Sequence, residues 1–124
     1  MVENTVDIMS IVKAGQVSLI YGAGVYGRKI YQLLTICKLG HKVACFVVSD
    51  GATRVDNTMG IPVITFENAE QQYPEAAILV AVKGAEELFE RVKRIHKGAV
   101  YFCQKEELCI LCHNMFIKLW DYPI

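Results

Sequence analysis

The chain has 124 residues, of which 53% are hydrophobic, and a formal net charge of +0 at pH 7. This composition favours one folded domain over residues 1–124 and excludes an intrinsically disordered chain. The neutral balance argues against a nucleic-acid-binding protein, which needs an excess of basic residues. Because neither a basic, apolar leader nor a membrane-length apolar run is visible, we expect a cytoplasmic protein whose cysteines are reduced.

Short apolar runs alternate along the chain with segments of helical periodicity. The expected strands are residues 17–21, 42–49, 61–66, 76–82 and 99–103. The expected helices are residues 7–14, 25–38, 84–97 and 105–120, with a brief helical turn at 67–74 and a polar loop at 50–60. This alternation predicts an α/β fold with a Rossmann-like, doubly wound, parallel five-stranded sheet and helices on both faces. Right-handed crossovers give the strand order 3-2-1-4-5.

Three glycines lie where the first strand passes into the first long helix, in the stretch "YGAGVYGRK". In one interpretation they only make a tight turn. In the other, Gly22 makes the turn, Gly24 admits a phosphate to the backbone, and Gly27 lets the helix pack closely on the strand. The motif follows a predicted strand and opens a predicted helix, so we favour phosphate binding by backbone amides. The segment around this phosphate is Gly22, Ala23, Gly24, Val25, Tyr26, Gly27 and Arg28.

Other candidate ligand contacts follow the second and fourth strands. Asp50, with Ser49 before it, stands close to the spacing at which a carboxylate holds ribose hydroxyls, although a turn-initiating role is the alternative. Arg54 could meet a 2′-phosphate, or it is a solvated loop arginine. Lys83 and Gly84 would lie across the crevice from the glycines, where open α/β sheets bind ligands. The alternative for Lys83 is an ordinary exposed lysine, and Arg28 is either a phosphate contact or solvent-facing.

Four stretches, "IYGAGVYGRKIYQLL", "ACFVVSD", "GIPVITFEN" and "AILVAV", together resemble the nucleotide-binding domain attached to bacterial surface-polysaccharide enzymes. That family includes the N-terminal domain of sugar acyltransferases of the left-handed β-helix type, and the domain preceding some nucleotide-sugar dehydratases and epimerases. The resemblance covers roughly residues 17–103, and the short loop before "GIPV" is also similar. It implies NAD(H) or a nucleotide-diphosphate sugar as ligand, in a module of a larger enzyme. The chain departs from the family where Val47, Val48 and Ser49 precede Asp50, because two acidic residues commonly follow the strand's phenylalanine there.

Catalytic and metal chemistry finds little support in the sequence. "CILCH" (109–113) matches the haem-attachment pattern, and Cys103 with His113 would extend it to a zinc set, but core cysteines in an apolar helix explain these residues better. Tyr101 and Lys105 have a dehydrogenase spacing but do not share a predicted helix. We therefore assign no catalytic acid, base or nucleophile.

The last predicted helix, 105–120, is apolar on most of its faces. Such a helix needs more cover than one sheet offers, so we expect a homo-oligomer contact or a missing second domain there. The alternative is a helix fully buried in its own fold. The chain's second candidate function follows from the same helix, namely a degenerate Rossmann fold that serves as a structural or oligomerisation module without a ligand.

Overall fold

The computed structural model describes residues 7–15, 17–51, 57–82 and 84–104 and the single residues 106, 109, 112 and 113. Within these residues the strands are β1 (Ser18–Tyr21), β2 (Val43–Val48), β3 (Asn57–Thr58), β4 (Ile61–Thr65), β5 (Ala77–Val80) and β6 (Val100–Phe102). The helices are α1 (Asp7–Ala14), α2 (Val25–Ile36), the short 3-10 helix η2 (Gly40–Lys42), α3 (Phe66–Gln72) and α4 (Glu86–Ile95).

The strands form one sheet in the order β3-β4-β2-β1-β5-β6. All neighbours in it are parallel except β3, which pairs antiparallel with β4. The expected five-stranded, wholly parallel sheet is therefore wrong in strand number, and β3 adds an edge strand to the order. The physical reason is a two-residue turn, because Met59 and Gly60 take φ values of 53° and 85° and fold Asn57–Thr58 back onto β4.

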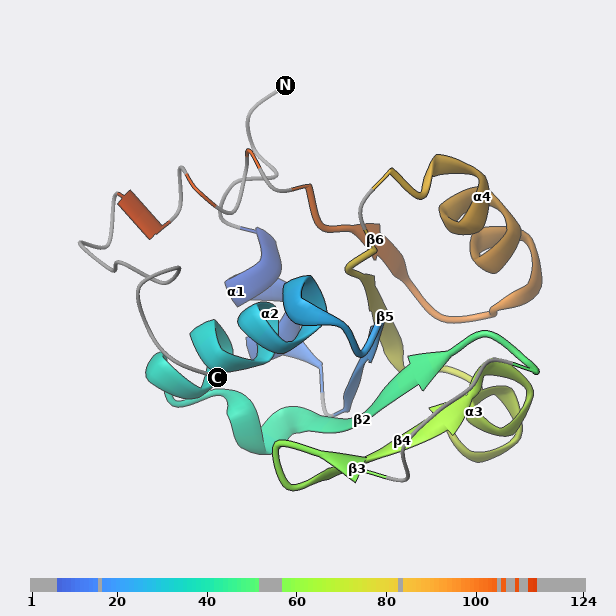
Figure 1. Cartoon of the computed structure of the whole chain (residues 1–124), viewed down its shortest axis with the longest axis horizontal. Helices are drawn as coiled ribbons and strands as arrows, with labels where there is room; N and C mark the ends of the chain where they lie inside the picture. The colour runs from blue at the N-terminus through green and yellow to red at the C-terminus, as the bar shows by residue number, and fades with distance from the viewer. Residues whose placement is uncertain are drawn as a thin grey trace.

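Apolar side chains fill both faces of the sheet, which explains the nearly continuous hydrophobicity of its strands. Ile20 of β1 packs among residues of α1 and α2, whereas Leu19 and Tyr21 pack among residues of α3 and α4. Figure 1 shows the same arrangement, with α1 and α2 on one side of the sheet and α3 and α4 on the other. The broad prediction of an α/β fold with helices on both faces is confirmed.

The predicted helix 105–120 falls mostly outside the described residues. Glu106, Cys109, Cys112 and His113 are described, and all of them are helical. Cys112 is buried in the core formed with α1 and α2. The intersubunit or interdomain contact expected from this helix stays a prediction. In the part of the chain that the structure covers, no helix is long and apolar enough to cross a membrane.

Candidate functional site at the carboxyl edge of the sheet

The glycine turn joins β1 to α2 at the carboxyl edge of the sheet, and two of its glycines are required by close packing. Gly22 has φ +123°, and a Cβ on it would lie 2.6 Å from the Ala81 carbonyl oxygen, just beyond β5. A Cβ on Gly27 would overlap the Gly22 carbonyl. Neither position therefore tolerates a side chain, which matches the turn and packing roles expected for these two residues.

Gly24 differs from both neighbours in the motif. It is the N-cap residue of α2, with φ −82° and ψ −164°, which any residue can adopt. A Cβ placed on it would meet nothing within 4 Å among the described atoms. The missing side chain therefore leaves open space in front of the helix instead of relieving a clash. This space is of the kind that a phosphate needs to approach the backbone closely.

The backbone amides around Gly24 are placed for an anion. The Gly22 amide donates to the Val47 carbonyl at 2.8 Å, and the Arg28 amide donates to the Gly24 carbonyl at 3.0 Å as the first bond of α2. The first turn of an α-helix has no intrahelical acceptor for its amides, and the helix dipole is positive there. Gly24, the N-cap of α2, has no side chain to cap these amides, no hydrogen bond from another described side chain to them is seen, and the first turn of α2 contains no acidic residue.

The other two crossover helices begin at the same edge and are supplied with acidic or polar side chains. In α3 the Thr65 hydroxyl accepts from the Asn68 amide at 3.3 Å. The Asp50 carboxylate accepts from the Glu67 amide of the same helix at 3.0 Å. The first turn of α4 carries Glu86 and Glu87. Of α2, α3 and α4, only α2 thus begins without an anionic or hydroxyl side chain of the protein.

The side chains that flank Gly24 in the segment lie in different places. Arg28 folds back so that its Nε donates to the Gly24 carbonyl at 3.2 Å, which holds the guanidinium beside the helix start. Val25 is 57% exposed, an unusual position for a large apolar side chain. Tyr26 points elsewhere, because its hydroxyl donates to the Cys103 carbonyl, beyond β6, at 2.5 Å. Ala23 packs partly against the core under α2.

The candidates after β2 have partners within the protein. The Ser49 hydroxyl is 3.0 Å from the hydroxyl of buried Tyr21. Asp50 is exposed, and its Oδ1 accepts the Glu67 amide described above. Sequence reasoning did not foresee this cap, because α3 lies far from Asp50 along the chain. The predicted ribose contact of Asp50 therefore competes with a structural one.

The candidates beyond β5 are only partly described. Lys83 and Arg54 lie outside the described residues. Gly84 has φ +64°, is exposed, and a Cβ on it would meet nothing within 4 Å among the described atoms. The structure therefore places Gly84 at the same carboxyl edge as the glycine turn, after β5, and gives it no contact that defines a role.

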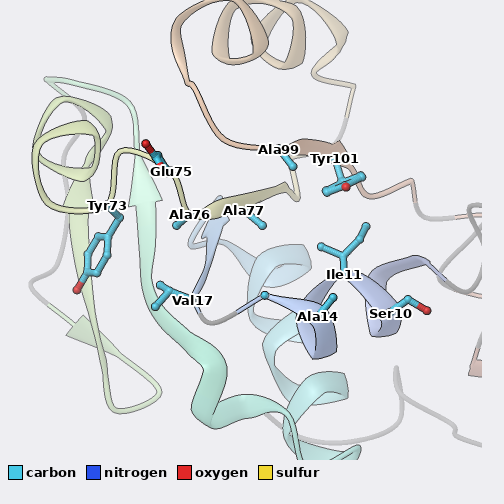
Figure 2. A pocket seen from close by; sticks show the side chains of 11 residues that line it. Ser10, Ile11, Ala14, Val17, Tyr73, Glu75, Ala76, Ala77, Ala99 and Tyr101 are labelled. Carbon is cyan, nitrogen blue, oxygen red and sulfur yellow. The ribbon is translucent and has the colours of Figure 1, made fainter.

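A pocket of about 730 Å³ lies at the opposite, amino edge of the sheet. Residues just before β1, β5 and β6 line it, together with α1, and Figure 2 shows Ile11 and Tyr101 on one side and Tyr73 and Glu75 on the other. Its described lining includes the Glu75 carboxylate and no basic residue. The pocket therefore does not suit a phosphate. Its small alanines carry no chemical pattern that the sequence could have revealed.

Two buried cysteines, Cys45 and Cys112, are poor nucleophiles in this fold. Burial raises the pKa of the Cys45 thiol from 9.0 to about 11. Burial also raises the pKa of Cys112, and the nearby thiols of Cys109 and Cys37 raise it further. Thiols that stay protonated near pH 7 neither attack nor bind metals readily. Among the described residues, no group of three or more His, Cys, Asp or Glu side chains is placed to hold a metal ion.

Three comparisons with known proteins complete the description of the site. No family model matches the chain, and neither do any curated protein or solved structure. The geometry of the site itself therefore indicates what it can bind. That geometry is an uncapped helix start behind an open glycine, with a fixed arginine and an exposed valine beside it.

Proposed function

We propose that the protein is a nucleotide-binding module whose ligand places a phosphate or pyrophosphate at the start of α2. The ligand is NAD(H) or a nucleotide-diphosphate sugar, in keeping with the resemblance to modules of bacterial polysaccharide and nucleotide-sugar enzymes. One observation carries the proposal: α2 begins at the open Gly24 with neither a side-chain cap nor an acidic residue in its first turn. By contrast, Thr65 caps α3, and the first turn of α4, although its N-cap Ala85 makes no side-chain bond, carries Glu86 and Glu87. An anion from outside would supply what α2 lacks.

The site's residues divide the binding of such a ligand among them. The backbone amides after Gly24 would donate to the phosphate oxygens, and the absent side chain would let those oxygens come close. Arg28 would add a charged donor, since its Nε already fixes the guanidinium at the helix start. The exposed Val25 side chain would cover an apolar face of the ribose or base.

The carboxyl ends of β1 and β5 would extend this site. β1 leads through α2 to β2 on one side, and β5 leads through α4 to β6 on the other. Ligands of open α/β sheets bind where the chain direction reverses in this way. Ser49 and Asp50 end β2 at the same edge, so Asp50 would reach a ribose through the carboxylate oxygen that does not cap α3.

Calorimetric titration with NADH and with UDP-glucose tests the proposal. The informative variant is Gly24→Ser, because serine is a good N-cap residue and its side chain fills the open space without a clash. We expect the wild type to bind one of the two ligands and Gly24→Ser to lose at least 10-fold in affinity while remaining folded. Ala14→Ser is the matched control, since it adds the same hydroxyl at the amino-edge pocket. Equal binding by the wild type and Gly24→Ser would contradict the proposal.

The alternative function is a structural or oligomerisation module without a ligand. The observation that favours it is that Ser49, Asp50 and Tyr26 are already engaged by the protein itself. Under this alternative, neither ligand gives heat in the titration. Gly24→Ser then only caps α2 and raises stability slightly.

A further inference from the structure

The outer face of α4 carries a stripe of charged side chains that is acidic in its first half and basic in its second half. Glu87, Glu90, Arg91 and Arg94 follow one another at i, i+3, i+4 and i+7, so they share one face of the helix. All of them are exposed, whereas Val92 is buried against the sheet. Figure 1 shows α4 on the outside of the molecule, beside β6. We call these residues the α4 stripe.

The α4 stripe is not neutralised within the described part of the protein. Glu87 with Arg91 and Glu90 with Arg94 have the spacing of ordinary pairs within a helix. However, the described residues contain one ion pair, between His96 and Glu70, and it lies elsewhere. The side chains of the stripe, with Glu86 and Leu88, instead line a shallow hollow on the helix surface. The stripe therefore presents extended charges with space between them.

The order of these charges makes the stripe complementary to itself. We propose that α4 docks against α4 of a second copy of this chain, antiparallel, about a twofold axis between Glu90 and Arg91. Glu90 then faces the partner's Arg91, and Glu87 faces the partner's Arg94. The twofold axis forms each of these ion pairs twice, as in an isologous interface. The dipoles of the two antiparallel helices also attract each other weakly, which favours the same arrangement.

Two further observations favour a second copy over another kind of partner. A partner of one charge would match only half of the stripe, whereas the reversed stripe matches all of it. Ile95, which is 54% exposed, and the half-buried Leu88 lie along the neighbouring row of the helix and would add apolar contact.

The chemistry of the contact predicts a weak dimer that depends on salt. Exposed ion pairs contribute little each, and dissolved ions screen them. We therefore expect self-association at high protein concentration and low ionic strength. Raising the ionic strength should weaken it.

Charge reversal in two halves tests this proposal in the full-length chain. Glu87→Arg with Glu90→Arg makes the stripe wholly basic, and Arg91→Glu with Arg94→Glu makes it wholly acidic. Sedimentation equilibrium should show that each double variant self-associates at least 10-fold more weakly than the wild type. An equimolar mixture of the two variants should recover the dimer, because a basic stripe then faces an acidic one.

Controls separate this contact from misfolding and from net charge. Circular dichroism should show that both variants are folded. Glu67→Arg with Glu75→Arg changes the net charge by the same amount and sign as the basic double variant, but at exposed positions away from α4. It should therefore leave self-association unchanged. A wild type that is monomeric at about 1 mM in low salt would overturn the proposal. So would double variants that dimerise like the wild type, or a mixture that stays monomeric.

Discussion

The helix ends at the two edges of the sheet differ in the hydrogen-bond partners that the protein supplies to them. At the amino edge, helices end and present carbonyl oxygens, and one lysine of the protein bonds two carbonyls there. Lys42 Nζ donates to the carbonyls of Lys13 and Gly15, at 2.9 Å and 3.1 Å, where α1 ends. At the carboxyl edge, α2 begins with no such partner among the described side chains.

A second polar contact at the amino edge is made by His96, the residue that follows α4. His96 is buried, with Nδ1 2.5 Å from Glu70 Oε2 and Nε2 2.5 Å from the Ala76 carbonyl oxygen. This contact ties the ends of α3 and α4 to the segment that enters β5. The comparison teaches that this chain can supply polar side chains to helix ends where structure requires them. The start of α2, with neither a cap nor an acidic first turn, is where the proposed function places the anion.

The largest difference should appear within the glycine turn itself. Gly27→Ala forces a methyl group into the Gly22 carbonyl, so we expect a loss of about 3 kcal/mol or more in the free energy of unfolding. Gly24→Ser should change it by less than about 0.5 kcal/mol, because its space is open and serine caps well. Urea denaturation of both variants measures the contrast. Similar losses in both would show that Gly24 is also held by packing.

Substitution of His96 tests whether its polar contacts stabilise the amino edge of the sheet. His96→Ala removes both contacts of a buried ring and leaves the Glu70 carboxylate and the Ala76 carbonyl without it. We expect a loss of about 3 kcal/mol in the free energy of unfolding, by urea denaturation. Glu70→Gln keeps a hydrogen-bonding oxygen at the same place and should cost less. A loss below about 0.5 kcal/mol in His96→Ala would mean that apolar packing, and not these polar contacts, stabilises this edge of the sheet.

Cys45 lies in the core between the two edges of the sheet, and its thiol makes the stability depend on pH independently of the contacts at either edge. Its folded-state pKa of about 11 exceeds the ordinary 9.0, because burial disfavours the thiolate. Above pH 9 the unfolded chain loses this proton while the folded chain keeps it, so stability falls as the pH rises toward 11. The full effect is about 2–3 kcal/mol.

Urea denaturation between pH 8 and pH 11 measures this term as a difference. The wild type should lose more stability than Cys45→Ala over the range from 9.0 to about 11, since other titrating groups are common to both. Parallel pH profiles would show that the Cys45 thiol ionises as readily in the folded protein as in the unfolded one.

The smallest expected effect concerns Asp50, which belongs to the carboxyl edge but serves α3. Asp50→Ala removes the acceptor of the Glu67 amide and should cost about 1 kcal/mol. Asp50→Asn keeps an acceptor oxygen and should cost less. If Asp50→Ala left stability unchanged but abolished nucleotide binding, the ribose contact would be the main role of this residue.

Much of the fold follows from local patterns in the sequence. The buried strands of the sheet are short apolar runs, and α1 has the bounds that its periodicity predicts. The hairpin at β3 could not be predicted, since it has two residues and turns through Met59 in a left-handed conformation. α2 ends at Ile36, earlier than expected, because Lys38 takes φ 67° and stops the helix.

The candidate site shows the same limit. Spacing alone assigned the turn to Gly22 and close packing to Gly27, and the positive φ of Gly22 and the tight contact at Gly27 agree with this. The partners of Asp50 and Ser49 depend on contacts between segments distant in sequence, which no local pattern encodes. The pocket at the amino edge was missed for the same reason, as it is assembled from α1 and from residues near the starts of three strands.

Amide chemical shifts during a nucleotide titration test the central claim most directly, because the two edges report separately. On adding NADH or UDP-glucose to the ¹⁵N-labelled chain, the account predicts the largest shift changes at Ala23, Gly24 and Val25. Val17, Ala77 and Ala99, at the amino-edge pocket, should change little. Changes concentrated at those three residues, or no changes with either ligand, would contradict the account.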